Sequence, residues 1–112
     1  MEDCIFCGLA SGRIECAKVY EDDKAIAFRD INPQAPVHIL IVPKKHLVKL
    51  HDAKDPLLLG GLMEIASKLA VGEGIAETGY RVVINTGRDA GQSVEHLHVH
   101  LLGGRNMKWP PG

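Results

Sequence analysis

The chain has 112 residues, of which 46% are apolar and 24% charged, and its formal net charge is -1. That length suits a single domain with one core, and we expect residues 1–112 to form it. The near-zero charge excludes general attraction to nucleic acid or an anionic membrane, and no apolar run approaches the roughly 20 residues of a membrane span. Three cysteines, and an acidic start unlike a signal peptide, predict a reduced, cytoplasmic protein.

Two cysteines near the N-terminus, Cys4 and Cys7, form a CxxC pair. The pair is compatible with half of a zinc site, with a redox pair or with two small buried residues. Structural zinc usually has four protein ligands, so two more would have to come from elsewhere, and histidines are the natural suppliers. His46 is one candidate, although the basic segment that it shares with Lys44 and Lys45 is also compatible with a solvated turn or with phosphate attraction.

Short strands are expected over residues 18–21 and 24–28, joined by a tight turn at Asp22-Asp23. Residues 37–42 are apolar on both faces except at His38, which predicts a central strand covered on both sides. A lone histidine in such a strand is more often hydrogen-bonded in the core than part of a site. From its neighbours alone, His38 is therefore assigned to the core.

One long helix is predicted, because Asp55-Pro56 has the form of an N-cap followed by proline at the first helical position. An apolar stripe at helical spacing follows, and Gly74 is a natural stop. Gly60-Gly61 inside this helix should cost roughly 1 kcal/mol per glycine and would permit close approach of a second backbone. A shorter helical turn is expected to end at Ser11-Gly12. The apolar stripe of the long helix consists of Leu58, Leu62, Ile65 and Leu69.

Three histidines alternate with apolar residues in the segment His96-Leu97-His98-Val99-His100. On a helix, His98 would point away from the other two. On a strand, successive side chains alternate between faces, so all three imidazoles would line one side, each roughly 6.6 Å from the next. The interleaved Leu97 and Val99 favour the strand. Three imidazoles on one rigid element can share acid, base and nucleophile roles near neutral pH; the alternative is three half-exposed surface histidines.

The segment before the histidines predicts a strand over residues 80–86, with Asn85 on its inward face, and a glycine-containing loop over residues 87–93. The two strands that this loop joins are expected to be antiparallel neighbours. Backbone N–H groups of such a loop can hold an anion beside the histidines without net positive charge. Near the end of the chain, Trp109 lies beside two prolines, and we expect it to dock against the protein.

The segment from Gly91 to Leu102 resembles the signature of the histidine triad superfamily, in which three histidines alternate with apolar residues after a Gly-Gln-Ser or Gly-Gln-Thr lead-in. Residues 28–38 and 41–46 resemble two further parts of the same family. The resemblance extends over essentially the whole chain, and a chance match of this length and order is very improbable.

Two features bear on which branch of the family the chain resembles: its C-terminal segment, and an N-terminal cysteine pair that departs from the usual pattern of one branch. Leu102-Gly103-Gly104-Arg105 followed by Trp109-Pro110-Pro111-Gly112 looks like the Hint branch, whose members are nucleoside phosphoramidases, and Ser93 also suits that branch. Many Hint proteins lack cysteines at the positions of Cys4 and Cys7. This pair resembles the zinc-binding pair of the related uridylyltransferases, which strengthens the zinc hypothesis.

The resemblance implies an α+β fold with a five-stranded antiparallel sheet, one long helix and one short helix, in a homodimer whose sheets join across the subunit interface. It implies a hydrolase that cleaves the P–N bond of purine nucleoside 5′-phosphoramidates through a covalent nucleotidyl-histidine, without a catalytic metal. The alternatives are a dinucleoside polyphosphate hydrolase of the same superfamily, a non-catalytic purine-nucleotide-binding regulator, and a metalloenzyme whose triad holds a catalytic zinc.

Matching the family residue by residue gives each position an expected role. His98 would be the nucleophile, and His100 would hold phosphate oxygens. Ser93 would relay a proton to the leaving amine, and His38 would orient the triad, which replaces its assignment to the core. The nucleotide-binding set would be Phe28, Asp30, Ile31, Asn85, Gly91, Gln92, Ser93, His98 and His100. A structural zinc would be held by Cys4, Cys7, His46 and His96.

Overall fold

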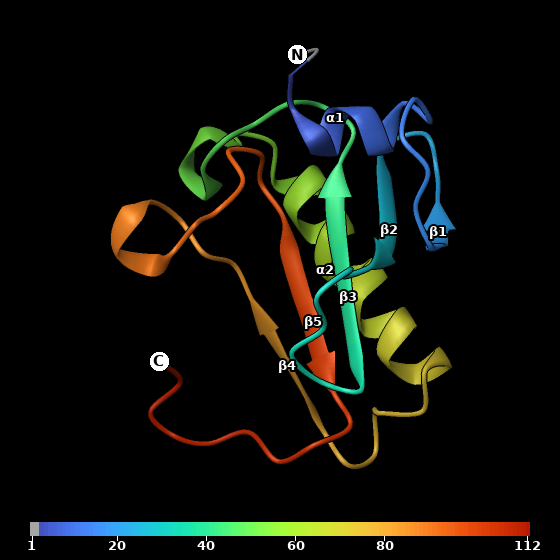
Figure 1. The fold of residues 1–112 in the computed structure, drawn as a ribbon, viewed down its shortest axis with the longest axis vertical. Coiled ribbons are helices and arrows are strands. Elements are labelled where there is room, and N and C mark those ends of the chain that lie inside the picture. Colours follow the sequence, from blue (N-terminus) through green and yellow to red (C-terminus); the bar gives the residue numbers. More distant parts are fainter. Residues whose placement is uncertain (1–2) are drawn as a thin grey trace.

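A five-stranded antiparallel sheet in the order β1-β2-β3-β5-β4 runs through the computed structural model, which describes residues 3–112 (Figure 1). This arrangement confirms the expected fold class. Residues 1 and 2, part of the expected domain and of the acidic start, lie outside the described residues. The strands are β1 (Lys18–Glu21), β2 (Ala25–Arg29), β3 (Val37–Pro43), β4 (Tyr80–Val83) and β5 (Val99–Gly103), and the helices are α1 (Ile5–Ala10) and α2 (Pro56–Gly72).

The sheet separates two apolar clusters, because alternate residues of its inner strands face opposite sides. On one side Ile39, Ile41 and Leu101 pack against α2, which crosses behind the sheet in Figure 1. On the other side Phe28 and Leu40 pack against α1. Strand β3 therefore lies in the centre, between β2 and β5, and is covered on both faces as its composition predicted.

Helix α2 begins and ends where the sequence indicated. The Asp55 carboxylate accepts a hydrogen bond from the Leu57 N–H at 3.0 Å, and Pro56 occupies the first turn. Gly74, just beyond the helix, has φ of +77°, a backbone conformation that favours glycine at a helix end. The helix buries Leu62 and Ile65 of the predicted stripe, each burial being worth about 1.5–3 kcal/mol.

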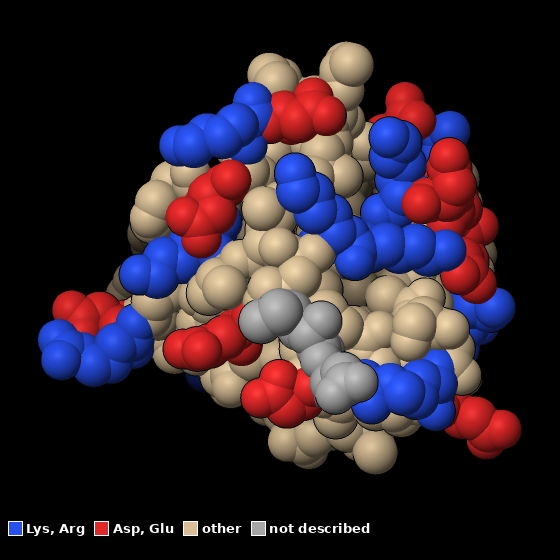
Figure 2. Space-filling view, turned by 90° about the horizontal axis from the view of Figure 1, so that it is seen from above, with Lys and Arg blue, Asp and Glu red and all other residues tan. Residues whose placement is uncertain are grey.

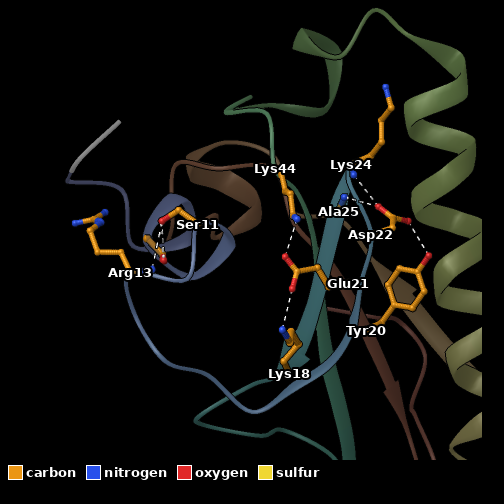
Figure 3. Close-up of polar contacts among 10 residues, drawn as sticks. Ser11, Arg13, Lys18, Tyr20, Glu21, Asp22, Lys24, Ala25 and Lys44 are labelled. Carbon is orange, nitrogen blue, oxygen red and sulfur yellow. Dashed lines mark hydrogen bonds and ion pairs between the residues drawn. The ribbon is translucent and has the colours of Figure 1, made fainter.

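The hairpin between β1 and β2 is organised by side-chain contacts in its turn (Figure 3). One oxygen of the Asp22 carboxylate accepts from the backbone N–H groups of Lys24 and Ala25, both at 2.8 Å, and the other accepts from the Tyr20 hydroxyl. Lys24 is thereby held in the turn, so β2 begins at Ala25, one residue later than expected. Glu21 binds Lys44 at 2.6 Å and so ties the hairpin to the end of β3.

The last two strands are shorter than predicted. They are antiparallel neighbours as expected, but β4 ends at Val83 and β5 begins at Val99. The expectation of one continuous histidine strand is therefore wrong for His96 and His98, which lie in the irregular segment before β5. The Leu97 N–H donates to the Leu47 carbonyl at 2.6 Å, which draws this segment away from the β4 ladder.

The C-terminal segment runs along the sheet end, held by Arg105, which donates to the Gln34 carbonyl, and by Arg81, which donates to the Lys108 carbonyl. Trp109 is nevertheless 82% exposed, so the expected docking is not found within the single chain. These backbone contacts position the tail without providing an apolar surface for the indole. None of the helices formed by residues 3–112 has the length and apolarity needed to cross a bilayer.

Candidate active site and cysteine–histidine cluster

A cavity of about 620 Å³ lies on the α1 side of the sheet, between α1 and the ends of β2, β3 and β5. Its volume is in the range of small-molecule sites, and its walls are mainly apolar with a few polar groups converging at one end. We call it the histidine pocket. It is lined by Ile5, Phe6, Leu9, Ile14, Glu15, Cys16, Ala17, Phe28, Arg29, Asp30, Ile31, Leu40, Ser93, Val94, His98 and His100.

His98 lines this pocket with a fixed tautomer. Its ring is only 4% exposed, and its Nδ1 lies 2.7 Å from the carbonyl oxygen of His96. A carbonyl only accepts, so Nδ1 must carry the proton and Nε2 must carry the lone pair in the neutral ring. The ring edge packs against Phe6 and against His100, with centroids 5.0 Å apart in both pairs. The backbone thus prepares Nε2 of His98 as a nucleophile or base.

Beside His98, the rings of His38 and His100 form a hydrogen-bonded pair whose tautomers are also fixed. The Gln34 N–H donates to Nδ1 of His38 at 3.0 Å, so the proton of neutral His38 must be on Nε2. That nitrogen donates to Nδ1 of His100 at 2.9 Å, which leaves the His100 proton on Nε2. The Asp30 carboxylate lies 3.4 Å from Nε2 of His38. His100 therefore offers an N–H donor to the pocket.

Burial keeps this histidine pair neutral. It lowers the pKa of His100 to about 4, and the nearby His98 and His38 rings act in the same direction. Burial also lowers the pKa of His38, against the opposing effect of Asp30. Both rings are therefore uncharged at neutral pH, and the hydrogen-bond directions above hold there.

The structure brings together some of the predicted nucleotide-binding residues and leaves others apart. Phe28 is buried in the pocket wall, Ile31 is 100% exposed at its edge, and Ser93 is exposed beside the histidines. Asn85, Gly91 and Gln92 are not among the lining residues.

The Gln92 side chain instead fixes the loop before the histidines. Its amide nitrogen donates to the carbonyls of Val48 and Val94, at 2.7 Å and 3.1 Å, and its oxygen accepts from the Gly87 N–H at 2.9 Å. All of these bonds are to backbone groups, so the side chain sets the shape of the loop that presents Ser93.

Sequence reasoning missed the α1 side of the pocket. Phe6 and Leu9 lie three residues apart on α1 and face the sheet, a spacing that was visible in the sequence as an apolar stripe. Leu40 lies two residues after His38 on β3 and shares its face, which strand alternation would have predicted. Cys16 had no comparable signal, because it lies outside any helix or strand.

A second group of side chains surrounds the ring of His96. Its members, Cys4, Cys7, His46 and His96, have ligand atoms within 4.8 Å of one another, and we call it the cysteine–histidine cluster. Sγ of Cys7 is 3.2 Å from Nδ1 of His46 and 3.5 Å from Nδ1 of His96, and Sγ of Cys4 is 3.3 Å from the latter atom. Sulfur and nitrogen ligands of a tetrahedral zinc lie about 3.6 Å apart, so the donor set fits zinc.

The surroundings of the cluster also suit a metal. Nε2 of His96 donates to the Pro43 carbonyl at 2.8 Å, so the lone pair of its Nδ1 points at the two sulfurs. Burial, with Cys4 beside it, raises the pKa of the Cys7 thiol, and a bound cation would have to displace that proton. The three cysteines, all among the described residues, are reduced.

Asp30, His38 and His100 form a further cluster of possible ligand atoms. Here the hydrogen bonds argue against a cation. His38 already uses Nδ1 to accept from the Gln34 N–H, so its Nε2 cannot give up its proton to a metal without creating an imidazolate or opposing two N–H groups. This arrangement suits proton and phosphate chemistry better than metal binding.

The fold and the site together define a class: an α+β protein with a histidine-lined small-molecule pocket. The chain belongs to the HIT family, since the HIT domain model matches residues 11–107. It is 54% identical over 112 residues to the 14 kDa zinc-binding protein of Zea mays, covering 96% of this chain and 87% of that one.

Two solved structures share the fold closely. One is a HIT family hydrolase from Legionella pneumophila, with a TM-score of 0.96 and 51% identity over 98% of this chain and 100% of that chain. The other is a histidine triad nucleotide-binding protein from Candida albicans, with a TM-score of 0.85 and 36% identity over 96% of this chain and 83% of that chain. These similarities support a hydrolase that binds nucleotides.

Proposed function

We propose that the protein hydrolyses purine nucleoside 5′-phosphoramidates through a covalent nucleotidyl-histidine on His98. The observation that carries this proposal is the 2.7 Å hydrogen bond from Nδ1 of His98 to the His96 carbonyl, which leaves the Nε2 lone pair for attack. The hydrolase and nucleotide-binding relatives support the general class of reaction. Hydrolysis of the P–N bond and a purine as the base are our more specific assignments.

In the first step, Nε2 of His98 attacks the α-phosphorus, a P–N bond forms to the ring, and the bond to the substrate amine breaks. The departing amine takes a proton that comes from solvent water and that the Ser93 hydroxyl at the pocket edge relays. In the second step, water attacks the phosphorus and loses a proton to solvent, the bond from the phosphorus to Nε2 of His98 breaks, and the nucleoside monophosphate leaves neutral His98. Each of these two displacements has a lower barrier than direct hydrolysis in a single step.

Charge on the phosphate oxygens builds up during both steps. The Nε2–H of His100, supported by His38, is one donor for these oxygens, and the backbone N–H of Ser93 would be another. The N–H groups of Gly91 and Gln92, which were expected to help, instead donate to the carbonyls of Arg88 and Gly87. Because His100 is neutral, it stabilises the oxygens by hydrogen bonding rather than by a full positive charge. His38 is thus a positioning residue for His100.

The nucleoside end of the pocket is assigned to the apolar wall. Phe28 and Ile31 would lie on the two sides of the base, and the Asp30 carboxylate would accept from the ribose hydroxyls. Asn85 is proposed to support the ribose or the phosphate from outside the lining. Gln92 acts through the loop that it holds.

A structural zinc in the cysteine–histidine cluster is part of the proposal. Four protein ligands with the spacing described above leave no open coordination position, so this ion would hold the four side chains together and take no part in the reaction. The zinc-binding relative from maize supports the assignment. Metal analysis of unchelated protein should give close to one zinc per chain, and only a trace would refute the site.

A homodimer in the cytoplasm completes the proposal. Strand β4 is an edge strand, and Tyr80 and Val82 on it are exposed, so a second copy could extend the sheet there. The cytoplasm is our assignment from the odd count of three cysteines, which does not suit a disulfide framework.

The test of function compares initial rates on adenosine 5′-phosphoramidate and on diadenosine polyphosphates. We expect the phosphoramidate to be the better substrate by kcat/KM. Faster cleavage of the polyphosphates would refute the phosphoramidase assignment and favour the related hydrolase. AMP binding without turnover of either substrate would favour a regulator, and immediate loss of activity with a chelator would favour catalytic zinc.

A further inference from the structure

His96 takes part in two sets of contacts at once, one through its ring and one through its backbone carbonyl. Its Nδ1 lies in the cysteine–histidine cluster, 3.3 Å from Sγ of Cys4, and its Nε2 is held by the Pro43 carbonyl. Its own backbone carbonyl accepts from Nδ1 of His98. The ring and the carbonyl of one fully buried residue thus connect the cluster to the histidine that faces the pocket. Any shift of the His96 backbone would move the carbonyl that fixes the His98 tautomer.

Helix α1 makes a second connection. Cys4 is its N-cap and accepts from the Cys7 N–H at 3.4 Å, so both cysteines lie in the first turn of this six-residue helix. Phe6, between them, contacts the His98 ring at 5.0 Å and Phe28 at 5.7 Å between centroids. The same short helix supplies Ile5, Phe6 and Leu9 to the pocket wall.

Among the described residues, helix α1 is held by two sets of contacts with the rest of the protein. It is shorter than the roughly 12 residues that a helix needs for stability of its own, so its position depends on tertiary contacts. One side of it packs on the sheet through Phe6 and Leu9, and its first turn is attached through Cys4 and Cys7 to His46 and His96. Loss of the cluster would leave the apolar contacts to hold the helix on the sheet.

We propose that the cysteine–histidine cluster controls the nucleotide affinity of the histidine pocket, with Cys4, Cys7 and His46 as positioning residues. A cation held by the four side chains fixes α1 as the pocket wall and fixes the His96 carbonyl against His98. Without the cation, the wall and the His98 tautomer are less ordered, and the nucleotide must order them on binding. This inference rests on the nucleotide pocket and the zinc site proposed above.

Linkage makes the effect reciprocal. If zinc strengthens AMP binding by some factor, AMP must strengthen zinc binding by the same factor. Coupling between protein sites is commonly about 5–150-fold, and we expect roughly tenfold here, because AMP touches the coupled groups directly. A purely structural zinc with no connection to the pocket would show no such factor.

The experiment uses the full chain in zinc-loaded and chelator-stripped forms, with metal content measured in each. Calorimetry gives the AMP dissociation constant for both forms, and competition with a chelator gives the zinc affinity with and without AMP. Nitrogen chemical shifts of the His98 ring report its tautomer without any nucleotide. We expect roughly tenfold weaker AMP binding, a matching change in zinc affinity, and mixed His98 tautomers in the stripped form.

A matched pair of variants separates the cluster from general effects of histidine loss. His46→Gln removes a cluster member that does not line the pocket, whereas His51→Gln alters an exposed histidine outside the cluster. The first should reproduce the stripped form in AMP affinity and His98 shifts, and the second should match the wild type. His46→Cys replaces the lost ligand with another one, so its AMP affinity and His98 shifts should be closer to the wild type than those of His46→Gln.

Two results would overturn the inference. One is unchanged AMP affinity together with unchanged His98 shifts in a stripped protein that remains folded by circular dichroism. The other is global unfolding on stripping, which would make the cluster a support of the whole fold. Failure of the loaded protein to hydrolyse a phosphoramidate would instead refute the proposed function, since the binding and tautomer measurements need no turnover.

Discussion

Nδ1 of His98 donates to the carbonyl oxygen of His96 at 2.7 Å, and this one bond connects the irregular backbone before β5 to the chemistry of the pocket. On a regular strand, that carbonyl would be available to the neighbouring strand instead. Because β5 begins only at Val99, the carbonyl of His96 is turned toward the ring two residues later. The departure from ideal strand geometry is therefore what sets the tautomer.

Replacement of His98 by alanine removes the proposed nucleophile. We expect kcat for adenosine phosphoramidate hydrolysis to fall by at least about 10³-fold, in line with the loss seen when covalent nucleophiles are removed. AMP affinity should change by only a few-fold, because the apolar wall around Phe28 is intact. Steady-state kinetics and calorimetry on the same preparation check both. Wild-type turnover by the variant would end the assignment.

Replacement of His38 by alanine tests its role as a positioning residue. His100 would lose the donor at its Nδ1, and its ring could then adopt either tautomer. We expect kcat to fall by about 10- to 100-fold with little change in AMP affinity, since proton-transfer and hydrogen-bonding partners typically contribute in this range. His38→Asn, which retains a donor near that position, should recover part of kcat. Equal losses in both variants would count against positioning through this bond.

Folding stability should decrease as the pH falls from 6.5 toward 4. The pKa of His100 is lowered to about 4 in the folded protein, whereas an unfolded histidine has its usual value of 6.5, so the unfolded chain takes up the proton first. The stabilising effect is complete above pH 6.5 and is lost as the pH approaches the folded pKa. Urea unfolding midpoints at several pH values measure this, with a slope of at most about 1.4 kcal/mol per pH unit from this residue.

His100→Asn provides the control for that pH dependence. The variant lacks the group whose pKa shifts, so its midpoint should depend less on pH between 6.5 and 4 than that of the wild type. The Arg29–Glu73 pair lowers the pKa of Glu73 and affects stability only below its usual value of 4.5, at the lower end of this range. Identical pH profiles for variant and wild type would contradict the assignment to His100.

A charge placed on the edge strand should disrupt the proposed homodimer. Val82 is exposed on β4, and arginine there would bring two like charges together across a two-fold axis. We expect Val82→Arg to sediment as a monomer at concentrations where the wild type is a dimer. Leu57→Arg, on an 85% exposed residue of α2 that lines a hollow together with residues of the β1–β2 hairpin, should remain dimeric. Dissociation by the Leu57 variant alone would place the interface elsewhere.

Charges of both signs are mixed on the surface of the protein (Figure 2). Acidic and basic side chains are interleaved over the face shown in Figure 2, with uncharged surface between them. This distribution agrees with the net charge of -1 and gives no general attraction for a polyanion. Local donors must therefore select any anionic ligand, and His100 is such a donor.

Much of the fold could be predicted from local patterns. The cap at Asp55, the composition of β3 and the alternation after Leu97 each depend on neighbours within a few residues, and the structure agrees with them. The exact strand ends could not be predicted, because they depend on distant partners. The Leu97–Leu47 backbone bond, which ends the regular pairing, joins segments fifty residues apart in the chain.

Local sequence patterns predicted less of the site than of the fold. Strand alternation grouped the three histidines, but it could not show that His96 would turn toward Cys4 and Cys7 while His98 faced the pocket. The resemblance to a known family supplied that grouping as an expectation. Trp109 illustrates the opposite case, since an apolar residue beside two prolines predicted docking that the single chain does not provide.

The most direct measurement of the central claim is detection of the covalent intermediate. Wild-type protein is mixed with excess adenosine phosphoramidate, quenched in base within one turnover, digested and mapped by mass spectrometry. The account predicts an adenylyl group on the peptide that contains His98, absent from the His98→Ala variant. Full turnover with no adduct at any time point, or an adduct on a different residue, would contradict it.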